Sequence, residues 1–308
     1  MTTEQASPAP LEEVFDVIGS RPIRHDGPDK VTGRARYAAD IHPPGWLVGK
    51  ILRSPHAHAV IRSIDTSRAL AVPGVKAVVT SADLPDVSAE IADQEEGSTV
   101  NYGFYSRNVM AREKALYVGH AIAAVAATSA AAAEEALGAL VVDYEVLPPV
   151  LNADDAMRDD APILHDRLVT LANPGMRQGG WGDANAKPSN ISNRFEFRLG
   201  EPEAGFAEAD VIVEREFHTR PVHQGYIEPH SATAQWSTDG SVTIWASSQG
   251  HFALRDHTAA ILGVVCRDSR SYPWRLVAGS EARGRVAATW SRSSRPSPAS
   301  AGSRSRSP

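Results

Sequence analysis

The chain has 308 residues, of which 42% are hydrophobic and 22% charged, a composition typical of a globular protein with room for two domains. No apolar run approaches the ~20 residues that a membrane span needs, and the first residues lack the features of a secretory signal. We therefore expect no membrane span and a cytoplasmic location. The single cysteine, Cys266, excludes an intrachain disulfide and any cysteine-built zinc site or iron–sulfur cluster within this chain.

The net charge of −6 is unevenly distributed along the sequence. Residues 264–308 carry nine arginines against two carboxylates, Asp268 and Glu281, so the rest of the chain is acidic. An acidic body argues against nucleic-acid binding, and we expect no nucleic-acid partner. The Arg-Ser-rich end, SRSSRPSPASAGSRSRSP, leaves RNA binding by this tail as a minor alternative.

Residues 1–20 are polar and are expected to be disordered. The next segments predict strands at LVGKILRS (47–54), AVIRSID (59–65) and VKAVVT (75–80), separated by Pro/Gly turns. Further on, a strand in YVGHAIAAVAAT (117–128), an alanine-rich helix over 129–140 and a strand in LVVDYEVL (140–147) form one unit. This order predicts a mixed α/β (α+β) domain over 21–150.

Residues 151–195 are rich in Asp, Asn, Pro and Gly, and predict a connecting segment on the surface. A second domain is expected over 196–264. Its predicted elements are a strand in DVIVEREFHTRP (210–221), two strands around the Asp239-Gly240 turn, and a helix in HFALRDHTAAILG (251–263) that ends at Gly263.

Three stretches, found in order, resemble the molybdenum hydroxylases, the family of xanthine dehydrogenase, aldehyde oxidase and aerobic carbon monoxide dehydrogenase. They are DGPDKVTGRARYAADIHPPGWL with LRSPHAHAVIRSIDTS, then YVGHAIAAVAA with VDYEVLPPV, and EREFHTRPVHQGYIEPHSATAQW with TIWASSQGHFALRDHTAAILGV. The resemblance covers roughly residues 20–264 and implies an α/β-hammerhead domain followed by the first strands and helix of a molybdopterin-binding domain.

The resemblance also implies cofactors and partners. Intact relatives oxidise aldehydes, N-heterocycles or carbon monoxide at a molybdenum-molybdopterin centre. They pass electrons to 2Fe-2S and FAD groups on partner subunits and assemble as dimers of heterotrimers. The family's general-base glutamate comes later in the subunit than the matching region, so no catalytic residue is expected within this chain.

The family's next motif, a glycine-rich loop of the type EIGGGFGGK, is missing from the sequence. Instead the chain reads CRDSRSYPWRLVAGSEAR (266–283). If Pro273 is encoded by CCA, reading one base earlier turns the TGG codon of Trp274 into ATG, and permitted codons then give Met-Glu-Ile-Gly-Gly-Gly-Phe-Gly-Gly-Lys. The sequence therefore predicts a frameshift near Val265, with residues 265–308 as an out-of-frame, disordered tail.

The resemblance identifies two cofactor-binding residues, Gln249 and Gly250. Gln249 matches a family glutamine that hydrogen-bonds an oxo ligand of molybdenum, for which an amide is suited because it donates without titrating. A plain structural role, in which Gln249 caps the turn before the helix, is the alternative.

Histidines elsewhere in the sequence allow a weaker hypothesis, that of a metal site. His223, Glu228 and His230 are metal ligands by type, but Pro229 interrupts any helix that would align them, and a packing role is favoured. His56 and His58 have a spacing that zinc can use but no carboxylate or cysteine partner. We expect no metal site from these residues.

Two other enzyme classes find no support in the sequence. No segment has the three glycines of a dinucleotide-binding fingerprint, and no GxSxG elbow of a hydrolase is present. The leading interpretation is thus a truncated molybdenum-hydroxylase large subunit, inactive by itself. The alternative is a non-catalytic interaction module that binds partner oxidoreductase subunits through the hammerhead domain.

Overall fold

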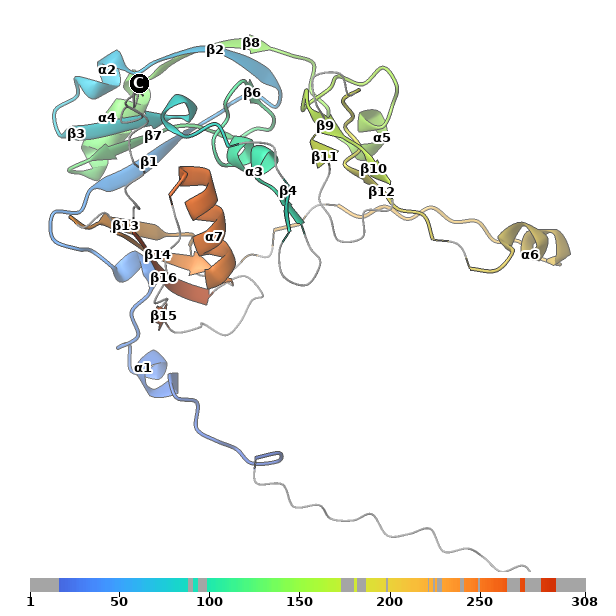
Figure 1. Cartoon of the computed structure of the whole chain (residues 1–308), viewed down its shortest axis with the longest axis horizontal. Helices are drawn as coiled ribbons and strands as arrows, with labels where there is room; N and C mark the ends of the chain where they lie inside the picture. Colours follow the sequence, from blue (N-terminus) through green and yellow to red (C-terminus); the bar gives the residue numbers. More distant parts are fainter. Residues whose placement is uncertain are drawn as a thin grey trace, which may run out of the picture.

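In the computed structural model the chain forms two units of mixed helix and sheet, joined by a long connecting segment (Figure 1). The structure describes residues 17–87, 91–93, 99–172, 180–181, 187–197, 199–220, 222–223, 225, 229–238, 241–248, 250–264, 272–274 and 284–291. Most of the predicted N-terminal segment 1–20 lies outside these residues.

The first unit holds two three-stranded antiparallel sheets, ordered β1–β7–β3 and β6–β2–β8. Their strands are β1 (Val48–Arg53), β2 (Ala59–Asp65), β3 (Val75–Thr80), β6 (Lys114–Ala115), β7 (Ala121–Ala127) and β8 (Val141–Val146). Each strand predicted from the sequence of this unit is confirmed.

One core of this unit lies between the first sheet and two helices, α2 (Ser67–Leu70) and α4 (Ala130–Ala139). Ala69, Val125 and Ala136 are buried there. The helix predicted over 129–140 is confirmed, and it begins where the Ala132 amide donates to the Ser129 hydroxyl at 3.2 Å. Such a cap satisfies one of the unpaired amides at a helix start.

A second core joins the two sheets. Ala111, Ala115 and Ile122 are fully buried in it. The partly buried side chains around them come from strands of both sheets and are Leu52, Ile61, Ile64, Val142 and Tyr144. Because the small residues of β7 and β6 take up little space, the layers can pack closely.

Helix α3 (Tyr102–Val109) follows a short hairpin of β4 (Ile91–Asp93) and β5 (Thr99–Asn101). The buried Asn101 caps this helix, since its Oδ1 accepts from the Phe104 amide at 3.0 Å. Three short helical turns complete the described elements: α1 (Gly27–Val31) and η1 (Ala38–Asp40) before β1, and η2 (Ser81–Asp83) after β3. Of these, η1 contacts β13 of the second unit.

The described part of the connecting segment contains short elements. They are α5 (Ala153–Ala156), the pair β9 (Leu168–Val169) and β11 (Gly180–Trp181), and the pair β10 (Leu171–Ala172) and β12 (Asn193–Arg194). The Asn190 side chain ties this segment together, because it donates to the Pro162 carbonyl at 2.9 Å and accepts from the Leu164 amide at 3.0 Å. Helix α6 (Pro202–Glu208) stands apart from both units in Figure 1.

The prediction of a strand over 210–221 is wrong for the described residues 210–220, which form no strand. Their apolar side chains are exposed: Val211 is 78% and Phe217 86% accessible. Alternating apolar residues form a strand only when another strand edge accepts their backbone hydrogen bonds and a core covers one face. No described strand pairs with this segment.

The second unit is an antiparallel sheet ordered β13–β14–β16–β15, covered by helix α7. Its elements are β13 (Ala232–Trp236), β14 (Ser241–Ser248), α7 (His251–Leu262), β15 (Tyr272–Trp274) and β16 (Gly284–Ser291). Val242 and Ala259 are buried between sheet and helix. The two predicted strands and the helix are confirmed, although the Asp239-Gly240 turn lies outside the described residues.

Helix α7 ends as predicted. Gly263 has a left-handed backbone with φ of 63°, and the Val264 amide donates back to the Ala259 carbonyl at 3.0 Å. This is the geometry of a glycine-terminated helix. None of the described helices has the length and hydropathy that crossing a membrane requires.

The region expected to be a disordered tail contains two strands. Strand β16 pairs with β14 along its whole length, and β15 pairs with β16. The open edge of β14 offers unpaired backbone groups, which a passing extended segment can satisfy. The other residues of 265–308, Cys266 among them, lie outside the described part of the chain.

The two units touch along α3 and α7. The ring of His257 lies 5.4 Å from the ring of Tyr105 and 5.9 Å from that of Tyr102. A second contact joins Thr233 to the segment between η1 and β1, because the Thr233 hydroxyl donates to the Ile41 carbonyl at 3.2 Å.

Candidate functional site

The turn before α7 is the position at which the sequence predicts cofactor contacts. Gln249 lies outside the described residues, whereas Gly250 is the exposed residue that begins the helix. The Gly250 amide donates to the Ser248 hydroxyl at 3.1 Å, and the Gly250 carbonyl accepts from the Leu254 amide at 2.9 Å. The backbone of this turn is therefore engaged within the chain.

The clearance around Gly250 bears on whether this residue must be a glycine for a molybdopterin cofactor to approach. A Cβ added to Gly250 would meet the Ala253 Cβ at 3.7 Å, an ordinary contact distance, so nothing described requires a glycine there. Such a cofactor would need donors from parts of the protein outside the described residues, and we derive no chemical step through it from this turn.

The structure separates the paired histidines His56 and His58. His58 is buried, and its Nδ1 donates to the Pro148 carbonyl at 2.9 Å, which ties the start of β2 to the segment after β8. His56 instead packs edge-on against the Tyr144 ring, with ring centres 5.0 Å apart. The two side chains thus make different contacts within the hammerhead domain.

The other histidines considered as metal ligands, His223 and His230, lie in the segment before β13. His223 and His230 are exposed, and the Gly225 amide donates to the His223 Nδ1 at 3.0 Å. Glu228 lies outside the described residues. Within the described part of the chain, no group of three or more His, Cys, Asp or Glu side chains could hold a metal ion.

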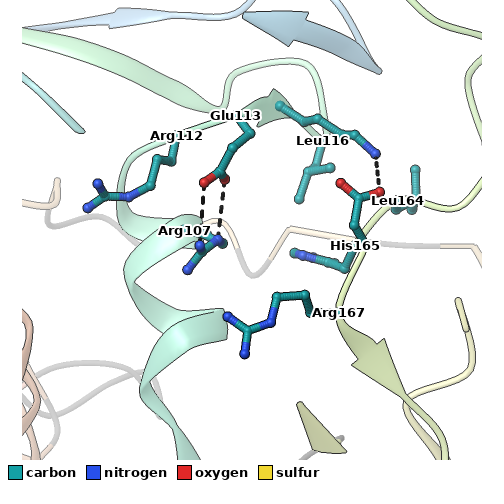
Figure 2. A pocket seen from close by; sticks show the side chains of 9 residues that line it. Arg107, Arg112, Glu113, Leu116, Leu164, His165 and Arg167 are labelled. Carbon is teal, nitrogen blue, oxygen red and sulfur yellow. Dashed lines mark hydrogen bonds and ion pairs between the residues drawn. The ribbon is translucent and has the colours of Figure 1, made fainter. Parts of the chain in front are cut away.

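The structure shows a charged cavity that the sequence did not predict. It has a volume of about 210 Å³ and lies between the end of α3, strand β6 and the segment just before β9 (Figure 2). Its lining consists of Arg107, Arg112, Glu113, Lys114, Leu116, Leu164, His165, Asp166 and Arg167. The available sequence signals were two charged runs, Arg-Glu-Lys at 112–114 and His-Asp-Arg at 165–167, but nothing in the sequence indicated that they meet.

Two ion pairs cross this cavity. Arg107 faces Glu113, with 3.3 Å between Nε and Oε2, and Lys114 holds Asp166, with 2.6 Å between Nζ and Oδ1 (Figure 2). Burial, and then the positive charges of Arg107 and other neighbours, lowers the pKa of His165 to about 4. The imidazole is therefore neutral at physiological pH.

Two family models match the chain in sequence order. The a/b hammerhead domain of aldehyde oxidase and xanthine dehydrogenase matches residues 32–148, and the molybdopterin cofactor-binding domain matches residues 184–270. The first match covers the two sheets with their helices, and the second covers β13, β14 and α7.

Sequence relatives agree with these matches. The probable hypoxanthine oxidase XdhD of Escherichia coli (strain K12) is 33% identical over 268 residues, which is 81% of this chain and 27% of that protein. The carbon monoxide dehydrogenase large chain of Afipia carboxidovorans is 30% identical over 267 residues, which is 85% of this chain and 31% of that protein. The chain thus spans less than a third of the length of these relatives.

Solved structures have the same fold over the matched part. Reconstituted CO dehydrogenase from Oligotropha carboxidovorans gives a TM-score of 0.61 at 32% identity, covering 80% of this chain and 29% of that one. Quinoline 2-oxidoreductase from Pseudomonas putida 86 gives 0.59 at 26% identity, covering 80% and 28%. The chain therefore belongs to the molybdenum hydroxylase family of xanthine dehydrogenase, aldehyde oxidase and carbon monoxide dehydrogenase, and corresponds to part of its molybdopterin-binding large subunit.

Proposed function

We propose that this chain is the hammerhead domain and the first part of the cofactor-binding domain of an oxidoreductase large subunit, interrupted by a frameshift near Val265. The uninterrupted subunit oxidises an aldehyde, an N-heterocycle or carbon monoxide at a molybdopterin centre. The chain as given is inactive alone. The observation that carries this proposal is the glycine motif MEIGGGFGGK, which the codons for Pro273 to Arg283 permit in the neighbouring frame.

Two features of the structure support inactivity of the chain as given. The backbone amide and carbonyl of Gly250 are already hydrogen-bonded within the chain. In addition, the strand β16 that occupies the edge of β14 belongs to the out-of-frame sequence. In the restored frame a different sequence, beginning with the glycine motif, would reach this edge.

Sequencing the genomic DNA across the codons for Gly263 to Arg283 tests the frameshift directly. One base more or fewer that restores the glycine motif supports it. A determined DNA sequence whose neighbouring frame does not encode the glycine motif would overturn the frameshift.

Metal content tests the assignment of function. The chain as given and the frame-restored subunit should be purified from a host that makes molybdopterin, and their molybdenum measured by mass spectrometry. We expect molybdenum only in the restored subunit. As a matched variant, Gln249→Ala in the restored subunit should reduce turnover more than metal content. Stoichiometric molybdenum in the chain as given would contradict the proposal.

A second candidate function is binding to partner subunits that carry FAD and 2Fe-2S groups. It rests on an exposed apolar patch of the hammerhead domain, formed by Val109, Tyr117 and Val118, which are 49%, 44% and 66% accessible. The Tyr117 hydroxyl lies 3.4 Å from the Asn108 carbonyl, which brings these residues together. Exposed apolar patches often mark contacts between proteins.

Co-purification with the two partner subunits tests this second function. We expect Val118→Asp to reduce recovery of the partners, because a charge would then be buried in the contact. Leu70→Asp is the matched control, since Leu70 is 52% accessible on α2, outside the patch. Equal recovery with all three versions of the chain would exclude this patch as the contact.

A further inference from the structure

Strand β13 has one open edge. Just before this strand, the Ser247 amide donates to the Ser231 carbonyl at 3.2 Å, in the same register that β13 and β14 keep. Bonded pairs alternate along an antiparallel ladder, so every second residue from Ala232 onward points its backbone amide and carbonyl away from β14. Within the described part of the chain, no backbone hydrogen bond uses these outward groups. They belong to Ala232, Ala234 and Trp236.

A groove runs along this edge, between the second unit and the hammerhead domain. It has a volume of about 740 Å³ and is lined by all five residues of β13, by the segment 42–47 and by the start of β1. The described lining contains no Asp, Glu, Lys or Arg. Trp46 and Trp236 line the groove and remain 49% and 55% accessible. Open backbone groups beside apolar side chains suit an extended peptide strand with an uncharged face.

Strand β13 also lacks the features that commonly protect a strand edge. Its sequence, ATAQW, contains no charged residue and no proline, which natural sheets place at open edges to prevent further pairing. An added strand would therefore gain backbone hydrogen bonds along β13 without meeting a charge.

The segment 211–217 has the complementary properties. No described strand pairs with it, although its sequence VIVEREF alternates as a strand would. Val211, Val213 and Phe217 fall on one face of an extended chain and are 78%, 70% and 86% accessible, whereas Glu214 and Glu216 fall on the other face. The segment directly follows α6, which stands apart from both units (Figure 1). It is therefore presented to other molecules.

We propose that the segment 211–217 of one copy of this chain inserts as an extra strand along β13 of a second copy, and that the exchange is reciprocal. The apolar face of the inserted strand covers the groove lining, and the outward backbone groups of β13 gain partners. The charges are compatible, because the lining is uncharged and the two glutamates of the strand face water. Arg215 shares the apolar face, and its guanidinium can lie on an exposed tryptophan ring of the groove.

Reciprocal exchange closes the assembly as a twofold dimer. Each copy donates one short strand, well below the roughly 20 to 30 residues a side of a standard interface, so we expect a dissociation constant in the micromolar range. The segment is then exposed in dilute solution and covered in the dimer. This inference concerns the chain itself and does not depend on the function proposed above.

Sedimentation velocity of the full chain over a wide range of concentration tests the proposal, in reducing buffer so that Cys266 cannot cross-link the copies. We expect a shift from monomer to dimer as the concentration rises. Gly49→Leu should weaken the dimer by at least about tenfold, because Gly49 lines the groove and an added Cβ meets nothing within 4 Å. Gly138→Leu, at an exposed position of α4 with equal clearance, is the matched control and should leave the dimer unchanged.

A second variant removes the donated strand instead of the groove. Val213→Asp should also weaken the dimer by at least about tenfold, since a charge would be buried against the apolar lining. Leu199→Asp is its matched control, because Leu199 is 83% accessible and lies outside the segment.

Mixing the two weakened variants separates the proposal from misfolding. Gly49→Leu keeps an intact segment and Val213→Asp keeps an intact groove, so a mixture should form heterodimers through one exchange at concentrations where neither variant dimerises alone. A damaged fold cannot produce that recovery. A wild type that stays monomeric at every concentration, as insertion of the segment into the groove of its own chain would produce, would overturn the proposal. Dimers that both variants leave unchanged, or a mixture that behaves as its separate components, would overturn it as well.

Discussion

The Nε2 of His120 donates to the carbonyl oxygen of Arg107 at 2.8 Å, and this bond ties the end of α3 to the start of β7. On the other side of the ring, Nδ1 accepts from the Leu116 amide at 3.2 Å. The imidazole is fully buried and stacks on Tyr117, with ring centres 4.4 Å apart. One neutral histidine thereby joins three segments of the hammerhead domain.

Replacing this histidine should destabilise the domain strongly. His120→Ala removes both hydrogen bonds, leaves two part-buried backbone groups without this side chain and opens a cavity, which together should cost about 2 to 4 kcal/mol of unfolding free energy. Urea unfolding followed by circular dichroism measures the change. His25→Ala, at an exposed position, is the control and should have little effect. If His120→Ala lowers the free energy of unfolding by no more than His25→Ala does, the structural role of His120 is wrong.

The stability of the chain should depend on pH through His165. Its pKa is about 4 in the folded chain, below the ordinary value of 6.5, because of burial first and the nearby Arg107 charge second. His165 therefore binds a proton more readily in the unfolded chain than in the folded chain. The contribution of the neutral, folded His165 to the free energy of unfolding is fully present above pH 6.5 and is lost as the pH falls toward 4. The loss should amount to about 1 to 3 kcal/mol.

Urea midpoints measured between pH 7 and pH 4, for the wild type and His165→Gln, test this prediction. Glutamine does not titrate, so the variant should lose less stability than the wild type over the window from 6.5 to 4, while the carboxylates titrate in both proteins. Burial also lowers the pKa of His120 and of His257, which both proteins retain. Parallel curves for the two proteins would show that His165 is not the group responsible.

Local signals were enough to predict most of the elements. The strands β2 and β3, the helix α4 with its Ser129 cap, and the end of α7 at Gly263 each follow from periodicity and cap or turn residues in one short segment. The strand expected over 210–221 does not form in the described residues 210–220, because no described strand pairs with this alternating segment. Pairing depends on distant sequence, which a local pattern does not report.

The two candidate sites also differ in how far the sequence could predict them. The assignment of Gln249 and Gly250 came from a resemblance spread over three stretches, and it stays a prediction because Gln249 lies outside the described residues. The charged cavity was not predicted, because Arg107 and His165 meet only through tertiary packing of α3 against the connecting segment. Charged runs such as 112–114 are usually solvated surface, so composition alone could not single them out.

The glycine at position 74 should be required for the turn before β3. It has φ of 94°, and an added Cβ would meet the Thr128 hydroxyl oxygen at 2.8 Å. Gly74→Ala should cost about 2 to 4 kcal/mol, from the unfavourable backbone and the crowding together. Gly45→Ala is the matched control, because φ is 75° but nothing lies within 4 Å, and should cost about 1 to 2 kcal/mol. Equal losses in thermal unfolding would show that Thr128 moves aside freely.

The hammerhead domain should resist proteolysis better than the rest of the chain. Its two cores bury Ile122, Val125 and several alanines, whereas Phe217 and Val222 in the segment before β13 are 86% and 87% accessible. Brief trypsin digestion of the full chain should therefore cut early at Arg215, and a fragment that retains residues 1–150 should accumulate, since cleavage requires locally open backbone. Peptide mapping by mass spectrometry identifies the cuts. Residues 200–263 surviving as long as residues 21–150 would mean that the second unit is as stable as the first, and that the exposed apolar segment is covered in solution.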